Sequence, residues 1–106
     1  MLTVVETSLF ASLWPRYWTE DERGEFAAYL ATHPDAGDVV PKTRGLRKVR
    51  WSRQGSGKSS GVRVIYFKRT IRQELALLLL YAKSRQANMT PHQLSEIRDA
   101  LQTSDD

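Results

Sequence analysis

The sequence predicts a small α+β domain, in which helices pack on an antiparallel sheet. Two segments begin with the capping pattern of helices, and several short segments have the β-branched or alternating composition of strands. The expected order of elements is β, α, α, β, β, β, α. With 106 residues, 41% of them hydrophobic, the chain is expected to form a single domain over residues 1–106.

The N-terminal segment is expected to hold a strand and a short helix. Residues 2–6, LTVVE, are rich in β-branched side chains, which favours a first strand. Residues 7–14 can form a short helix, and Pro15 is expected to end it.

A second helix is predicted from a capping box. Thr19 is suited to the N-cap and Glu22 lies three residues later, with further acids where the helix dipole favours them. The helix is expected to stop at His33-Pro34 and to be followed by a turn over residues 35–38. Its expected buried side chains are Phe26, Tyr29 and Leu30.

From residue 44 onward the hydrophobic period changes to two. Within residues 46–51, Val49 and Trp51 are expected to face the core, while Lys48 and Arg50 point to the opposite side. A strand with two basic side chains on one face is therefore predicted.

The following loop contains a motif that resembles part of a phosphate-binding P-loop. Residues 55–59 read GSGKS within the Gly/Ser-rich segment 54–61, but Ser52 stands where the P-loop requires its first glycine. A strand, residues 62–67, rather than a helix is expected to follow. A basic hairpin loop is the better interpretation.

The apolar run at residues 75–82 has good helix propensity, yet a helix of this composition would be apolar on nearly every side. A strand covered on both faces explains it better. A last helix is expected to start at Thr90, with Pro91 at its first position and Gln93 closing the cap. Its expected buried stripe is Leu94, Ile97, Ala100 and Leu101.

The basic residues are segregated from the acidic ones. No acidic side chain occurs between Asp38 and Glu74, and that interval holds 11 of the 16 Lys and Arg residues. They are Lys42, Arg44, Arg47, Lys48, Arg50, Arg53, Lys58, Arg63, Lys68, Arg69 and Arg72. Such segregation creates a local positive field, which indicates a nucleic acid, or an acidic protein that mimics or masks one, as the partner.

Other functional classes receive little support. The chain has no cysteine, and His33 and His92 are too far apart in sequence to suggest a metal site, so no cofactor is expected. A catalytic role for His92 is disfavoured because the first turn of a helix opposes its cationic form. The N-terminus lacks the charged region of a signal peptide, and the run at 75–82 is too short to span a bilayer, so a cytoplasmic protein without membrane association is expected.

Lys48, Arg50 and Arg63 form the strongest candidate for chemistry. If the two strands that carry them are neighbours, the three cations converge on one face of a rigid sheet. They are then suited to hold a scissile phosphate and to stabilise the charge that develops on it. The alternative is an ordinary solvated sheet face.

Five short segments, in order, carry a resemblance to a known family. They are residues 37–40 (GDVV), 45–50 (GLRKVR), 55–58 (GSGK), 61–66 (GVRVIY) and 81–83 (YAK). On these the chain resembles the RelE superfamily of toxins from toxin–antitoxin systems, and most of all its HigB branch. The expected βααβββα order agrees with that likeness.

The resemblance implies a type II toxin that cleaves messenger RNA on the ribosome and so inhibits translation. Its implied partners are mRNA, the ribosome and a cognate antitoxin, typically of the helix-turn-helix type. The implied reaction is attack of a ribose 2′-hydroxyl on the adjacent phosphate, which leaves a cyclic phosphate and needs no metal. Acid–base work would then fall to lysine or to groups activated by phosphate.

The resemblance also assigns roles to residues. Lys48 and Arg50 match the paired basic residues of the family, Arg63 matches the arginine that grips the scissile phosphate, and Lys83 lies in its basic segment after the last strand. The basic residues expected to bind RNA are Arg47, Arg53 and Lys58. Tyr81 or Tyr66 could replace the C-terminal aromatic with which the family stacks on a base, or either could belong to the core.

Three features depart from the family pattern. No aromatic residue follows Tyr81, Ser84 stands where an arginine is common, and the loop at 58–60 is less basic than in similar proteins. A non-catalytic basic module that binds nucleic acid or a protein partner, in effect a degenerate toxin, is therefore the alternative function.

Overall fold

The computed structural model describes residues 2–51, 61–82 and 89–105, with the last four of these described by their backbone only. The elements are β1 (Thr3–Glu6), α1 (Ser8–Leu13), the 3-10 helix η1 (Trp14–Arg16), α2 (Glu20–Thr32), β2 (Asp38–Val39), β3 (Arg47–Trp51), β4 (Val62–Arg69), β5 (Glu74–Ala82) and α3 (Pro91–Asp105). The α+β class predicted from the sequence is confirmed.

The five strands form one sheet in the order β1-β5-β4-β3-β2. The sheet is mixed, so the prediction of an antiparallel sheet was wrong in part. β1 pairs with β5 in parallel, with Thr3 opposite Glu74 and Glu6 opposite Leu77, whereas the other pairs are antiparallel. The composition of residues 2–6 predicts a strand but carries no information about the direction in which it pairs. The two-residue strand β2 was not expected.

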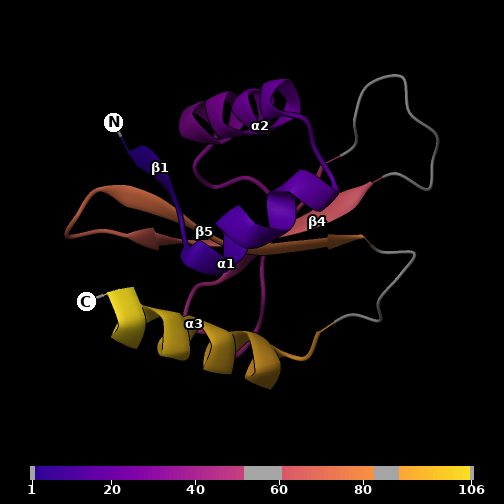
Figure 1. The fold of residues 1–106 in the computed structure, drawn as a ribbon. Coiled ribbons are helices and arrows are strands. Elements are labelled where there is room, and N and C mark those ends of the chain that lie inside the picture. The colour runs from indigo at the N-terminus through magenta and orange to yellow at the C-terminus, as the bar shows by residue number, and fades with distance from the viewer. Residues whose placement is uncertain (1, 52–60, 83–88, 106) are drawn as a thin grey trace.

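The sheet is covered on both faces, with α2 on one side and α3 on the other (Figure 1). One hydrophobic cluster joins α1 and α2 to the sheet through Phe10, Phe26 and Leu30, and a second joins α3 to the opposite face through Leu94. β5 lies between β1 and β4, and all residues from 75 to 81 are buried. The prediction of a strand for this apolar run is confirmed, because both of its faces are needed for the core.

The helix ends follow the local sequence. The Thr19–Glu22 capping box at the start of α2 is present, and Thr90 and Gln93 exchange the equivalent two hydrogen bonds ahead of α3. Pro15 does not directly follow the α-helical turns: α1 ends at Leu13, and Pro15 lies inside η1, whose first turn tolerates a missing N–H group.

The buried stripe of α3 differs from the prediction at one position. Leu94 is buried, and Ile97 and Leu101 are half-buried, but Ala100 is exposed. Arg98, one turn after Leu94, is buried instead, with 4% of its surface exposed. The helix is rotated so that a long cationic side chain, rather than a methyl group, lies against the sheet.

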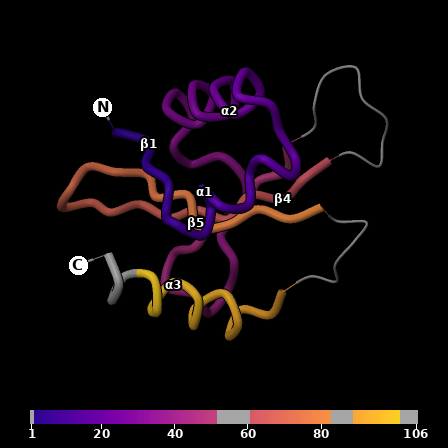
Figure 2. The backbone as a smooth tube through the Cα atoms, in the orientation of Figure 1, coloured from indigo at the N-terminus to yellow at the C-terminus, as the bar shows by residue number. Residues whose placement is uncertain are grey.

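The two ends of the sheet differ in what they carry. Trp51, Val62 and Ala82 are paired across β3, β4 and β5 at one end. The turn of the β4–β5 hairpin lies at the other end (Figure 2). Both ends carry basic residues: Arg50 and Arg63 lie near the first, and Lys68 and Arg69 lie near the second.

Candidate nucleic-acid interface

Three predicted site residues lie side by side across the sheet. Arg50 on β3 is directly opposite Arg63 on β4, and Arg63 is directly opposite Tyr81 on β5. Lys48, two residues before Arg50, is paired with Ile65. Because side chains two apart on a strand share a face, Lys48, Arg50 and Arg63 belong to the same side of the sheet.

The other face of β3 packs against α2, as the alternation predicts. Val49 is buried in the cluster beneath α2. The Trp51 ring lies 5.3 Å from the Phe26 ring and 5.0 Å from the Tyr29 ring, measured between centroids. These apolar contacts hold β3 in place and direct Lys48 and Arg50 to the opposite side.

Arg63 is the most unusual member of the group. It is only 8% exposed, and none of the acidic residues that the structure describes forms an ion pair with it, with Lys48 or with Arg50. Like charges placed opposite each other on neighbouring strands destabilise a sheet, and burial of a charge without a partner among the described residues adds to that cost. Basic side chains gathered on one face of a sheet are suited to an anionic ligand.

Tyr81 supports Arg63 from the β5 side. Its ring is 4% exposed and belongs to the hydrophobic cluster beneath α3. Burial raises the pKa of Tyr81, and the positive charge of Arg63 opposes that rise only in part. The phenol is therefore neutral at physiological pH. In this position Tyr81 packs beside Arg63 in the hydrophobic cluster and does not present a free ring for stacking on a base.

Three predicted site residues lie outside the described part of the chain. Arg53 and Lys58 belong to residues 52–60, and Lys83 begins residues 83–88. The motif at 55–59 lies there as well. β4 follows this segment, as expected, where a P-loop would need a helix.

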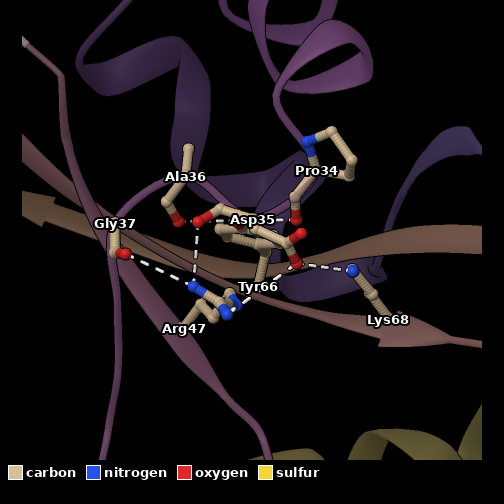
Figure 3. Close-up of polar contacts among 7 residues, drawn as sticks. All are labelled: Pro34, Asp35, Ala36, Gly37, Arg47, Tyr66 and Lys68. Atoms are coloured by element: carbon tan, nitrogen blue, oxygen red, sulfur yellow. Dashed lines mark hydrogen bonds and ion pairs between the residues drawn. The ribbon is translucent and has the colours of Figure 1, made fainter.

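Arg47 occupies the opposite face of β3 and is engaged with the turn before β2 (Figure 3). Its Nη1 donates hydrogen bonds to the carbonyl oxygens of Asp35, at 2.9 Å, and Gly37, at 3.3 Å. Asp35 also forms an ion pair with Lys68 and holds its carboxylate 3.8 Å from Arg47 Nη2. Arg47, predicted to bind RNA, thus has a structural role here.

Tyr66 on β4 also bonds to the backbone of this turn. Its hydroxyl donates to the carbonyl oxygen of Ala36 at 2.6 Å and lies 3.1 Å from that of Pro34 (Figure 3). Burial raises the pKa of Tyr66 to about 12. Its ring is fully buried, so Tyr66 is a core residue.

The same turn packs closely on β3 at Gly37. Gly37 has a φ of 77°, and a Cβ there would lie 2.2 Å from the Lys48 carbonyl oxygen.

The two histidines make local contacts. The His33 ring stacks on Tyr29 with centroids 4.4 Å apart, at the end of α2. His92 Nε2 lies 2.8 Å from a Glu96 carboxylate oxygen on the exposed side of α3. Within the described ranges, no three His, Asp or Glu side chains gather as metal ligands would.

A second basic group was not identified from the sequence. Arg44, Lys68, Arg69 and Arg98 line a pocket with Phe67, toward the hairpin end of the sheet. The spacing of α3 contains a signal for it: Arg98 follows Leu94 by four residues, which places it on the buried face of a helix. Only the fold brings residue 98 to residues 44 and 67–69.

Comparison with models of known protein families found no match for this chain. In the part of the chain that the structure covers, no helix has the length and apolar character needed to cross a membrane.

Proposed function

We propose that this protein is a toxin of a type II toxin–antitoxin system, of the RelE superfamily and its HigB-like branch, which cleaves mRNA on the ribosome. The observation that carries the proposal is the row of Arg50, Arg63 and Tyr81 across three strands, with Arg63 buried and not paired with a described acid. The order of elements and the resemblance at the five segments between residues 37 and 83 support it.

The proposed reaction is cleavage of the RNA backbone by its own ribose. The 2′-oxygen attacks the adjacent phosphorus, the bond from phosphorus to the 5′-oxygen breaks, and a 2′,3′-cyclic phosphate remains. One proton leaves the 2′-hydroxyl and another reaches the departing 5′-oxygen. Negative charge grows on the non-bridging oxygens during this step, and fixed cations stabilise it best when they are already in place.

The residues divide these tasks. Arg63 grips the scissile phosphate, because the residue is largely buried on β4 and its guanidinium can donate two parallel hydrogen bonds to phosphate oxygens. Arg50 and Lys48 add charge from β3. Tyr81 is a positioning residue beside Arg63 on the neighbouring strand. Lys83 is assigned to acid–base work by the family resemblance, and Arg53 and Lys58 are assigned to RNA contact by their place in the basic interval of the sequence.

The alternative is a basic module that binds RNA or an acidic protein without cutting. The departures from the family pattern favour it, and so does the buried ring of Tyr81, which leaves no stacking platform at that position. The two functions differ in how sharply they depend on single residues. A nuclease requires Arg63, whereas a binding surface loses affinity in similar steps as each cation is removed.

Growth of bacteria after tightly controlled expression tests the proposal. Wild type should arrest growth, with ribosome-bound messages cut in their coding regions, and Arg63→Ala and Lys48→Ala should relieve the arrest. Arg16→Ala is the matched control, because Arg16 is an exposed cation in η1, outside the site. It should arrest growth as the wild type does.

Two results would oppose the proposal. Full arrest by Arg63→Ala would remove Arg63 from the mechanism. Absence of arrest by folded, abundant wild-type protein would favour the binding module.

A further inference from the structure

The pocket near the hairpin end of the sheet has the lining of an anion site. It has a volume of about 290 Å³ and is lined by Arg44, Phe67, Lys68, Arg69 and Arg98. Arg63 and Arg69 are six residues apart on β4, so this pocket lies roughly 20 Å along the strand from the Arg50–Arg63 row. It is a second basic site, distinct from the proposed catalytic one.

Arg98 is the central group of the pocket. Its side chain is 5% exposed, its Nη1 donates to the Arg44 carbonyl oxygen at 3.3 Å, and its Nε lies 3.7 Å from Asp99 Oδ1. The guanidinium carbon lies 5.8 Å from the centre of the Phe67 ring. Its Nη2 is buried and has no hydrogen-bond partner among the described residues. An unsatisfied buried cationic donor is costly, which indicates that a ligand completes it.

The loop that carries Arg44 is held in an uncommon backbone conformation. Lys42 and Arg44 have φ angles of 64° and 56°, a region that residues other than glycine rarely adopt. Thr43, buried between them, accepts a hydrogen bond from the Leu46 N–H and donates one to the Val40 carbonyl oxygen. The loop is thus fastened in a strained form, and such strain is typical of functional positions.

The charge balance of the pocket is positive. Acids approach its cations from outside the lining: Asp99 pairs with Arg44, Glu74 with Arg69, and Asp35 with Lys68. These three carboxylates do not line the pocket, whereas four cations do. Burial and the nearby Arg44 lower the pKa of Arg98, which nonetheless stays charged at neutral pH as arginines do.

We propose that this pocket binds a phosphate group. The guanidinium carbons of Arg69 and Arg98 lie 5.5 and 5.8 Å from the centre of the Phe67 ring. Arginine side chains can offer paired N–H donors to phosphate oxygens, a geometry that suits phosphate well. The volume is ample for one phosphate group, since a water molecule occupies about 30 Å³. The phosphate can belong to an RNA backbone or be a free ion, and the site does not require the protein to be a nuclease.

Two titrations of the full chain test this assignment. In the first, inorganic phosphate is added at constant ionic strength while NMR follows the arginine Nε–Hε signals. In the second, a fluorescent, uncleavable 2′-O-methyl RNA oligonucleotide is titrated and its anisotropy measured. Arg44→Gln is the test variant, because Arg44 is exposed and its loss should not impair folding. Arg16→Gln is the control of equal charge change.

In wild type and Arg16→Gln, the Arg98 signal should shift with saturation on adding phosphate, and Arg44→Gln should bind at least about fivefold more weakly. Arg44→Gln could also weaken RNA binding and reduce, by about one, the number of counterions released on binding, as read from the slope of log affinity against log salt concentration. In that case the phosphate belongs to an RNA chain. If RNA binding is unchanged, the site serves free phosphate. Absence of saturable binding by either probe, or equal binding by Arg44→Gln, would overturn the proposal.

Discussion

The two sides of β3 use neighbouring basic residues in opposite ways. On one side, Arg47 donates hydrogen bonds to two carbonyl oxygens of a turn and lies near the carboxylate of Asp35. Its positive charge is therefore compensated by groups of the folded chain. On the other side, Arg50 lies opposite Arg63, and no described acid pairs with either of them. The sequence places all three in one acid-free interval. The alternation of side chains along β3 separates Arg47 from Arg50, and the strand register brings Arg63 beside Arg50.

A structural charge is satisfied by groups of the fold, whereas a functional charge is not. Arg47, Tyr66 and Asp35 satisfy one another around a tight turn, so changes among them should affect stability. The Arg50–Arg63 pair opposes folding, so changes there should affect RNA binding or cleavage and leave stability equal or improved.

The largest effect on stability is expected for Gly37→Ala. The new Cβ would lie 2.2 Å from the Lys48 carbonyl oxygen, and φ is 77°. The free energy of unfolding should fall by about 3 kcal/mol, measured by urea titration. Gly24→Ala is the matched control: nothing lies within 4 Å of its Cβ, and it should stabilise α2 by roughly 0.5–1 kcal/mol. Equal stability of the two variants would show that the turn is not closely packed on β3.

Tyr66→Phe should cost about 1–2 kcal/mol of unfolding free energy. It removes the hydroxyl that donates to the Ala36 carbonyl oxygen at 2.6 Å and leaves the buried ring in place. Chemical denaturation measures the loss, and Tyr17→Phe, at a half-buried tyrosine elsewhere, serves as control. RNA cleavage by Tyr66→Phe should be normal. A slower reaction at full stability would place Tyr66 in the site instead of the turn.

Arg50→Thr should stabilise the sheet slightly while weakening RNA binding. It relieves the repulsion with Arg63 across the strands and puts a good strand former on β3, a gain of roughly 0.2–1 kcal/mol. RNA affinity should decrease, and the number of counterions released on binding, read from the slope of log affinity against log salt concentration, should fall by about one. A clear loss of stability would mean that Arg50 makes a favourable contact in the folded state and does not merely repel Arg63.

The smallest effect is expected for Asp35→Asn, and it should depend on pH. The hydrogen bond and charge of Lys68 lower the pKa of Asp35 in the folded state. The unfolded chain therefore binds a proton more readily, so the carboxylate favours folding at neutral pH and ceases to do so as the pH falls below about 4. Wild type should be slightly more stable than the variant at pH 7, and the two should converge in acid. A constant difference over that range would exclude the ion pair as its cause.

Much of the fold could be predicted because its signals are local. The capping boxes at Thr19 and Thr90, the alternation at β3 and the apolar run of β5 each identify an element without knowledge of its neighbours. The parallel pairing of β1 with β5 could not be predicted, because it joins residues about 70 positions apart. The position of Ala100 was wrong because Arg98 competes for the same buried stripe.

The candidate site was predictable only in part for the same reason. Alternation placed Lys48 and Arg50 on one face, and the register then brought Arg63 beside them. Charge alone could not separate Arg47, whose partners are backbone carbonyl groups of a turn. The pocket around Arg98 requires a loop, a helix and a strand end to meet, which no local pattern reveals.

In the proposed function Arg63 grips the scissile phosphate, whereas Arg47 stabilises the turn before β2. The single-turnover rate at which purified protein cuts a ribosome-bound message distinguishes these two roles. Arg63→Gln should be about 100-fold slower than wild type or worse, with an unchanged unfolding midpoint, because one transition-state contact of this kind contributes that much. Arg47→Gln should cut at the wild-type rate and unfold more easily. Cleavage by Arg63→Gln at the wild-type rate would contradict the account.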